Sequence, residues 1–306
     1  MYFGYASKKR MLNVFSCSKS SSTPNSLAFS LNFSKSSNLQ IIKEKLLTIL
    51  YKHSCMPSIV YSTTNIASAS IARALQENFS LKGIDFVQTD KHILEIPCDM
   101  QTDFIIVPST HKSQSNMRTL TVHAPGNWCK ADFGGKEKTL NTVYASKMKE
   151  ILCSMHSQVQ EKKLDWNVSL EVDHHGPTCS SPILFAEIGS TQQEWRDEQA
   201  AQIVAQAIWD ALAHTKKCKC VLGIGGGHYA PLFSKYEIEK EELAMGHMLP
   251  KYRVDEVEYK TFLQGITKTV EKTEYAIIDW KGLDSKQREK MISFCDRAEL
   301  QYEKKK

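Results

Sequence analysis

The chain has 306 residues, 42% of them hydrophobic and 24% charged, with a net charge of +5 and a pI near 8.6. This composition is ordinary for a globular protein and excludes wholesale disorder and a coiled coil, and the length suits one large α/β domain. No apolar run approaches the roughly 20 residues that a membrane-spanning helix needs, so we predict a protein that does not span a membrane. The positive charge suits a polyanionic partner but does not establish one, because part of it lies near the termini.

The first 57 residues differ in composition from the rest. Between Met1 and Lys43 there is no Asp or Glu, and the basic residues lie in a Ser-rich background. This is typical of an organellar transit peptide, with a disordered or wrongly assigned leader as the open alternative. Residues 39–50 predict an amphipathic helix without an assigned role. We therefore predict a leader over 1–57 and a domain over 58–306, located in the cytoplasm, or in a chloroplast or mitochondrion if the leader is a transit peptide.

The domain shows alternating strand and helix patterns. Predicted strands cover 59–64, 104–107, 119–123, 167–172, 183–188, 220–222 and 275–280, and predicted helices cover 67–79, 140–159, 192–214 and 285–300. The helix at 192 has Thr191 as its N-cap and Glu194 in the capping-box position. The alternation favours an α/β sandwich. The nine cysteines are odd in number and form no C-x-x-C pair, so we expect reduced thiols in an intracellular compartment.

Asp173-His174-His175-Gly176-Pro177-Thr178 directly follows a predicted strand. The ends of strands in an α/β sheet commonly present functional groups, and a tight turn can direct adjacent histidines to different sides. Neutral imidazoles there can bind zinc or act as general acid and base near pH 7. Two polar residues that satisfy a turn are the alternative.

Glu187-Ile188-Gly189-Ser190-Thr191 ends a predicted apolar strand and opens a helix. Free N–H groups at a helix start can bind a phosphate, a carboxylate or an oxyanion, so Ser190 and Thr191 are candidates for substrate binding. Capping explains both residues equally well. Glu187 is a candidate metal ligand or general base.

The glycine-rich segment Gly223–His228 follows another predicted strand. Pro231 discourages an immediate helix after it, which argues against a dinucleotide-binding loop. We predict instead that backbone N–H groups of Gly225, Gly226 and Gly227 approach a ligand closely and that His228 enters the pocket. A purely structural turn is the alternative.

A fourth segment adds two histidines, His111 and His123, and a loop that contains Asn127. Single histidines in such places are often ordinary polar groups, but four histidine-bearing strand ends in one chain favour a site. The combined set could supply a metal-dependent or general-base hydrolase without a cysteine nucleophile: His111, His123, Asp173, His174, His175, Glu187 and His228. The motifs of serine α/β hydrolases, P-loop NTPases and zincin proteases are absent.

At these motifs the sequence resembles the archaeal and plant family of D-aminoacyl-tRNA deacylases. The matching segments are Leu120–His123, Gly126–Trp128, His174–Thr178, Glu187–Thr191 with Trp195, Gly223–Pro231, Gly246-His247 and Leu249–Tyr252. The resemblance covers roughly residues 58 to 280. It implies hydrolysis of the ester between a D-amino acid and tRNA, an aminoacyl-tRNA substrate, Zn²⁺ as cofactor, and a three-layer α/β/α sandwich similar to phosphorylases and peptidyl-tRNA hydrolases. Thr110 departs from the basic residue expected before His111.

From the motifs and the resemblance we assign three sets of site residues. The catalytic set is His174, His175, Glu187 and His228; the substrate-binding set is Asn127, Ser190, Thr191, Gly225, Gly226 and Gly227; the metal set is His123, His174, Glu187 and His228. Two other classes stay open: a phosphorylase-like or peptidyl-tRNA hydrolase-like enzyme on another nucleotide substrate, and a non-catalytic RNA-binding protein. The second predicts a basic, aromatic surface, whereas Lys and Arg are dispersed along the chain. The sequence does not decide the oligomeric state.

Overall fold

The computed structural model describes residues 56–114, 116–214 and 216–306, which belong to one unit spanning Ser54–Lys306. The leader, including the helix expected at 39–50, lies outside the described residues. Within the described ranges, no helix is both long and apolar enough to cross a membrane.

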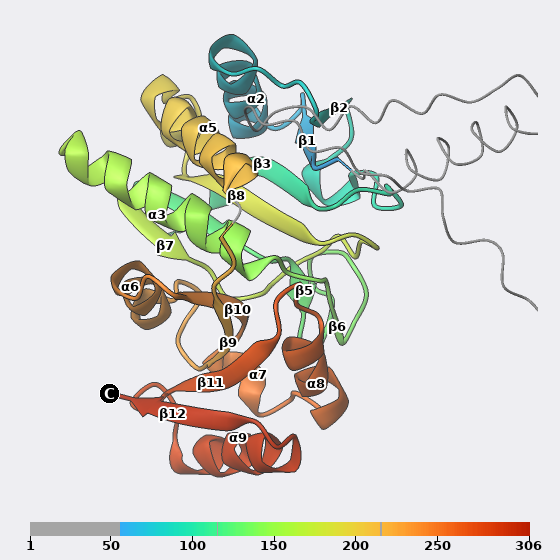
Figure 1. Cartoon of the computed structure of the whole chain (residues 1–306), viewed down its shortest axis with the longest axis vertical. Helices are drawn as coiled ribbons and strands as arrows, with labels where there is room; N and C mark the ends of the chain where they lie inside the picture. The colour runs from blue at the N-terminus through green and yellow to red at the C-terminus, as the bar shows by residue number, and fades with distance from the viewer. Residues whose placement is uncertain (1–55, 115, 215) are drawn as a thin grey trace, which may run out of the picture. The chain divides into compact units, whose positions relative to one another are not determined.

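A six-stranded mixed sheet forms the first half of the unit (Figure 1). Its strands, in spatial order, are β2 (Asp85–Thr89), β1 (Ser58–Ser62), β3 (Ile105–Lys112), β8 (Ile183–Ser190), β4 (Thr119–His123) and β7 (Asn167–Leu170). Neighbouring strands are parallel except β4 and β8, which are antiparallel. Because β4 runs against β8, its last residue, His123, pairs with Phe185 near the start of β8.

One face of this sheet is apolar and carries the helices α2 (Ile66–Asn78), α3 (Ala145–Glu161) and α5 (Glu198–Ala213). Alternate strand residues such as Ile106 and Leu184 pack there against Ile151 and Val204 of the helices. The other face packs Val107 and Phe185 against the segment around the 3₁₀ helix η1 (Ile93–Glu95). Since side chains alternate along a strand, this second face also receives His111 and Glu187.

A second, fully parallel sheet has the order β10 (Leu243–Leu249), β9 (Lys219–Ile224), β11 (Thr273–Asp279) and β12 (Gln301–Lys305). It carries helices on both faces (Figure 1): α3 and α6 (Pro231–Glu239) pack with Val221, whereas α8 (Tyr259–Thr267) and α9 (Ser285–Arg297) pack with Leu222. The remaining elements are α4 (Gln192–Trp195), α7 (Lys251–Val254) and the hairpin of β5 (Gly126–Asn127) and β6 (Thr139–Leu140). The α/β sandwich expected from the sequence is confirmed.

Three predicted boundaries were wrong. The helix expected at 192–214 is broken, because Asp197 starts a second helix by accepting a hydrogen bond from the Ala200 N–H, although the Thr191–Glu194 capping box is present as predicted. The helix expected from Leu140 begins at Ala145, because Leu140 pairs with Gly126 in the hairpin. The helix expected to close the chain is followed by β12.

No helix follows the glycine-rich segment immediately, as expected, although Pro231 starts a helix rather than preventing one. Helix α6 begins at Pro231 itself. Proline is favoured at the first position of a helix because the N–H it lacks has no intrahelical acceptor there. Three residues, His228 to Ala230, still separate the glycines from this helix.

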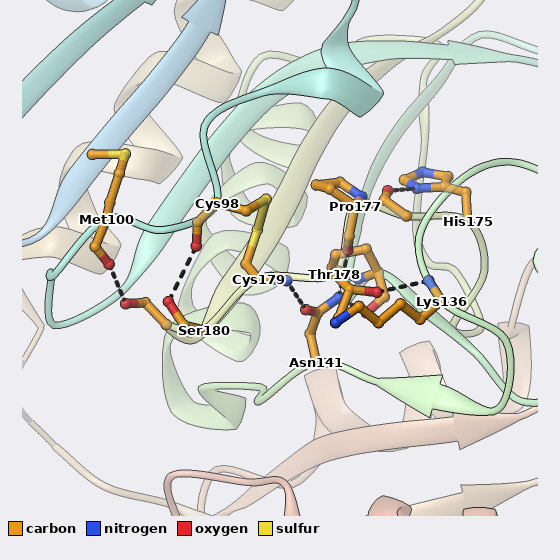
Figure 2. The surroundings of a disulfide bond; sticks show 12 residues. Cys98, Met100, Lys136, Asn141, His175, Pro177, Thr178, Cys179 and Ser180 are labelled. Atoms are coloured by element: carbon orange, nitrogen blue, oxygen red, sulfur yellow. Dashed lines mark hydrogen bonds between the residues drawn. A yellow bond between two sulfur atoms is a disulfide. The ribbon is translucent and has the colours of Figure 1, made fainter.

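A disulfide joins Cys98 and Cys179 (Figure 2), so the expectation of reduced thiols throughout was wrong for this pair. The two cysteines lie in loops that the fold brings together, and the Cys179 N–H donates to Asn141 Oδ1 at 2.7 Å. Cys129, Cys153, Cys218, Cys220 and Cys295 are free. Sequence spacing could not indicate the pair, because its members are 81 residues apart.

Loss of this disulfide is expected to lower the free energy of unfolding by about 4 kcal/mol, because the bond restricts a long loop of the unfolded chain. Denaturant unfolding of the double variant Cys98→Ser/Cys179→Ser measures the effect against the oxidised wild type. Cys153→Ser, which removes a free thiol, serves as the control. Equal midpoints for the oxidised wild type and the double variant would contradict the expectation.

Glu237 of α6 is fully buried, and its Oε2 accepts a hydrogen bond from the Met245 N–H at 3.0 Å. Burial raises the pKa of this carboxyl from 4.5 to about 8. The folded chain therefore binds a proton that the unfolded chain releases above about pH 4.5, so stability falls as pH rises from there to about 8. At pH 7 the loss amounts to about 3 kcal/mol.

Glu237→Gln has no proton to release and is expected to unfold at higher denaturant concentration than the wild type at pH 7, but at the same concentration at pH 4. Urea unfolding at both pH values measures this difference. A difference that is the same at pH 4 and pH 7 would show that the carboxyl does not titrate in this range.

Candidate active site

The segment that follows β7 joins the two sheets and builds the site. Its backbone forms hydrogen bonds to both halves: the Val172 N–H donates to the His228 carbonyl at 3.1 Å, and the Asp173 N–H donates to the Met248 carbonyl at 3.2 Å. The His174 carbonyl accepts from the Gly126 N–H at 3.2 Å. These bonds place His174 between the strand ends of the first sheet and the loop after β9.

Five histidines and two glutamates meet at this junction. The ring centroid of His174 lies 4.4 Å from that of His123, 4.5 Å from that of His175 and 4.6 Å from that of His228. The His111 ring lies 5.5 Å from the His228 ring. The structure thus brings together all the histidines that the sequence analysis selected.

Glu171 lies at the centre of this cluster and was not predicted from the sequence. Its carboxylate is fully buried and lies 2.8 Å from His228 Nε2, 3.1 Å from His111 Nδ1 and 3.5 Å from His174 Nε2. It stands in a run of strand-like residues, and only its position three residues before His174 could have indicated a functional role.

Glu187 projects from β8 into the same cluster, as predicted for a residue at the end of an apolar strand. Its Oε2 lies 3.6 Å from His111 Nδ1 and 3.8 Å from His123 Nε2. Burial by itself would raise the pKa of Glu187, but the interactions with the two histidines outweigh it and lower the pKa to about 2. The pKa of Glu171 is likewise lowered, against the effect of burial, by His111 and His228.

The histidines divide by charge. Burial would lower the pKa of His111, but Glu171 and Glu187 outweigh burial and raise it to about 11. Burial, with the charge of His123 second, lowers the pKa of His175 to about 4 and that of His174 well below its ordinary value. His174 and His175 are therefore neutral at pH 7, the state in which an imidazole can accept a proton or bind a metal ion.

Backbone carbonyls fix the orientation of the two neutral rings. Nδ1–H of His174 donates to the Val172 carbonyl at 2.8 Å, and Nδ1–H of His175 donates to the Gly176 carbonyl. A carbonyl can only accept, so Nε2 of each ring carries the free electron pair. His111 is held by Tyr229, whose hydroxyl lies 2.9 Å from Nε2.

The donor set fits a zinc ion. Both ring nitrogens of His123 and both carboxylate oxygens of Glu171 are buried without a hydrogen bond of good geometry, although Glu171 Oε2 lies close to His228. Imidazole nitrogens and carboxylate oxygens are ligands that zinc prefers. In the part of the chain that the structure describes, three sets of residues have donor atoms within 4.8 Å of one another: His123, His174 and His175; His111, Glu171 and His228; and His123, Glu171 and Glu187.

The four residues predicted as metal ligands fall into different sets. His123 and His174 share one set, His123 and Glu187 share another, and His228 belongs to the third. Glu171 and His123 each belong to two sets. Among the described residues, no set contains all four predicted ligands.

A cavity of about 200 Å³ opens beside the cluster. His174, His175 and His228 line it, whereas Glu171 and His123 lie buried behind them. The rest of the lining comes from the aromatic residues Trp128, Phe133 and Tyr252, the charged residues Lys130, Asp132, Asp173 and Arg253, and Gly126 and Asn127. A substrate in this cavity would contact the imidazoles directly.

The predicted substrate-binding residues have different surroundings. Asn127 lines the cavity, and its Nδ2 donates to the Gly134 and Lys136 carbonyls. Ser190 donates to the Met117 carbonyl at 2.7 Å and Thr191 caps α4, and neither is among the described residues that line the cavity. Both therefore have the capping and structural contacts that the sequence analysis kept as the alternative.

The prediction that the Gly225 N–H approaches a ligand was wrong. This N–H donates to the Leu249 carbonyl at 2.8 Å and is not available to a substrate. Gly225 has a φ of +109°, and a Cβ there would lie 2.9 Å from Cβ of Asp279, so glycine is required by the fold. Of the three predicted amides, Gly226 and Gly227 stay candidates.

Asp173 supports the site from behind. Its Oδ2 lies 2.8 Å from Nδ1 of His247, and its Oδ1 accepts from the Met248 N–H at 3.2 Å. Both side chains are fully buried. Asp173 therefore fixes the start of the loop that carries His174 rather than acting on a substrate.

Comparisons with known proteins agree on one family. The family model described as D-aminoacyl-tRNA deacylase matches residues 98–303. The D-aminoacyl-tRNA deacylase of Pyrococcus furiosus is 37% identical over 214 residues, 70% of this chain and 77% of the relative. That of Thermococcus onnurineus is 32% identical over 275 residues, 81% of this chain and 99% of the relative. A crystal structure of a conserved protein of unknown function superposes with a TM-score of 0.74 and 26% identity, covering 82% of this chain and 95% of that one.

Proposed function

Since the chain belongs to the D-aminoacyl-tRNA deacylase family, we propose that its histidine and glutamate cluster hydrolyses the ester bond between a D-amino acid and tRNA. The protein is an ester hydrolase that releases the free D-amino acid and the tRNA. The observation that carries the proposal is the row of imidazoles at the cavity, two of them neutral and backed by the buried carboxylate of Glu171.

The cavity histidines supply the proton transfers of this reaction. The side chain of His228 is 39% exposed and lies 2.8 Å from Glu171, which can stabilise it when it is protonated. It takes a proton from the attacking water and returns one to the ribose oxygen as the bond between that oxygen and the carbonyl carbon breaks. Nε2 of His174 and Nε2 of His175 can each accept a proton, because Nδ1–H of each ring donates to a backbone carbonyl.

We also propose that the cluster binds Zn²⁺. The support is the set of buried donor atoms described above, and the residues that would hold the ion are members of the three sets, with Glu171 and His123 common to two of them each. When bound, zinc would polarise an ester carbonyl and make water acidic enough to react near neutral pH. A three-layer order similar to that of phosphorylases and peptidyl-tRNA hydrolases is the finer fold that we propose for the same sandwich.

Selection of the D-amino acid would be steric. A cavity of about 200 Å³ leaves little freedom for the α-substituents of an aminoacyl group whose ester must face the histidines. In an L-amino acid the hydrogen and the side chain at the α-carbon are exchanged. Its side chain would then point into the cavity wall, and the steric clash would exclude it.

The test is deacylation of D-tyrosyl-tRNA and L-tyrosyl-tRNA by the purified full chain, measured as the release of labelled tyrosine. We expect rapid release from the D ester and little from the L ester. Equal release from both esters would contradict the selectivity, and no release from either would contradict the proposed function.

A further inference from the structure

Two aromatic side chains at the rim of the cavity are exposed to solvent. Phe133 is 69% exposed and Tyr252 is 49% exposed, and both line the cavity beside the catalytic histidines. Among the five large hydrophobic side chains that are exposed in the described ranges, they are the aromatic ones. Exposed apolar side chains that gather at a site indicate a binding surface.

The loop that carries Phe133 packs closely against the loop of residues 173–178, which carries His174 and His175. The Phe133 carbonyl accepts from the Gly176 N–H at 3.0 Å, and the Lys136 N–H donates to Thr178 Oγ1 at 2.9 Å. A Cβ at Gly176 would collide with the backbone of Gly135, so the two loops approach as closely as only glycine allows. The ring of Phe133 is thus exposed although its backbone is fixed next to His175.

Tyr252 belongs to α7, which also lines the cavity, and an ion pair joins α7 to the Phe133 loop. Its neighbour Arg253 lies 2.7 Å from the carboxylate of Asp132, which precedes Phe133 in the chain. The Arg253 guanidinium also lies 5.7 Å from the centroid of the Tyr252 ring. The ion pair therefore links the two segments that carry the aromatic rings, and both rings remain exposed.

We infer that Phe133 and Tyr252 form a stacking platform for the unpaired bases at the 3′ end of the tRNA. The inference rests on the proposed function, because the ester that the histidines cleave is attached to the terminal ribose. That ribose carries its base within the same nucleoside, so a base must lie close to the cavity rim. Aromatic rings bind unpaired bases by stacking, whatever their sequence.

The charges at the rim suit the same ligand. Lys130 lines the cavity and Lys251 adjoins Tyr252, and both are exposed, whereas Asp132 is paired with Arg253. Lys130 at the cavity, and Lys251 next to Tyr252 in the chain, are cations that can contact the phosphates that link the bases. The aminoacyl group, by contrast, must face the histidines inside the cavity.

The probe is a short RNA that ends in cytidine, cytidine and 2-aminopurine riboside, whose fluorescence falls when the last base stacks. We expect the full-length wild type to quench the probe. Phe133→Leu and Tyr252→Leu keep apolar bulk but remove the ring, and each is expected to weaken binding about 5- to 150-fold. Phe133→Trp and Tyr252→Phe should retain quenching. Val270→Ala, which truncates an exposed apolar side chain that does not line the cavity, is the control.

Deacylation kinetics separate a stacking role from a structural one. In the leucine variants the KM for D-tyrosyl-tRNA should rise by a similar factor while kcat stays within about twofold, and D-alanyl-tRNA should show the same change. An unchanged KM with unchanged quenching would overturn the platform, as would a loss confined to D-tyrosyl-tRNA, which would place the amino acid on the rings. A wild type that binds the probe but deacylates no tRNA would contradict the proposed function and leave the platform standing.

Discussion

Replacement of Glu171 by glutamine is expected to lower kcat/KM for D-tyrosyl-tRNA by about a thousandfold. The substitution keeps the shape of the side chain but removes the negative charge that lies closest to His111 and His228. Removal of one partner from a buried ion pair costs about 3–5 kcal/mol, because the remaining charge stays buried without compensation. A loss of about 4 kcal/mol in transition-state stabilisation corresponds to the expected thousandfold decrease. Initial rates of deacylation measure it.

The matched control is Glu237→Gln, the same substitution at another fully buried glutamate. Burial raises the pKa of Glu237 to about 8, so its carboxyl is mostly neutral at pH 7 and glutamine replaces it with little change in charge. We expect Glu237→Gln to retain activity within about threefold. Circular dichroism should show that both variants fold. A folded Glu171→Gln variant with wild-type activity would remove Glu171 from the site.

The sequence predicts the histidines of the site because of where they stand along the chain. His123 ends β4, His174 follows β7 and His228 follows β9, and strand ends are where α/β folds present functional groups. The alternation of strand and helix patterns along the chain indicates the sandwich, because helices that alternate with strands pack on the faces of a sheet. The capping box at Thr191 is also visible in sequence, because it depends on residues three apart.

Glu171 was missed because its role depends on contacts between distant segments. The imidazoles around it come from residues 111, 174 and 228, which only the pairing of the strands brings together. The same reason applies to the antiparallel setting of β4 and to the Cys98–Cys179 disulfide. The Gly225 amide was assigned wrongly because a glycine-rich loop has the same sequence whether its N–H groups bind a ligand or the neighbouring strand.

Removal of the proposed zinc ion is expected to lower kcat/KM by at least about a hundredfold, and addition of Zn²⁺ should restore it. Loss of the ion would leave two carboxylates and several imidazoles buried without the cation that they bind. It would also remove the polarisation of the ester carbonyl that we propose for the metal. Loss of the ion would also lower the free energy of unfolding, because a ligand whose free concentration is a thousand times its Kd stabilises the folded chain by about 4 kcal/mol. Dialysis against a chelator removes the ion. Metal analysis, deacylation rates and thermal unfolding then measure zinc content, activity and stability.

His123→Ala tests whether the cluster is where the ion binds. His123 is fully buried, both of its ring nitrogens are without a hydrogen bond, and it belongs to two of the three donor sets, so its loss should reduce the bound zinc as well as the activity. His156→Ala removes a half-buried histidine of α3 outside these sets and should change neither. Selective deacylation that is unchanged by chelation would contradict the zinc proposal. The buried carboxylates and imidazoles would then carry out proton transfer without a metal ion. In that case the active enzyme would hold His111 charged, because its pKa is raised, and His174 neutral, because its pKa is lowered.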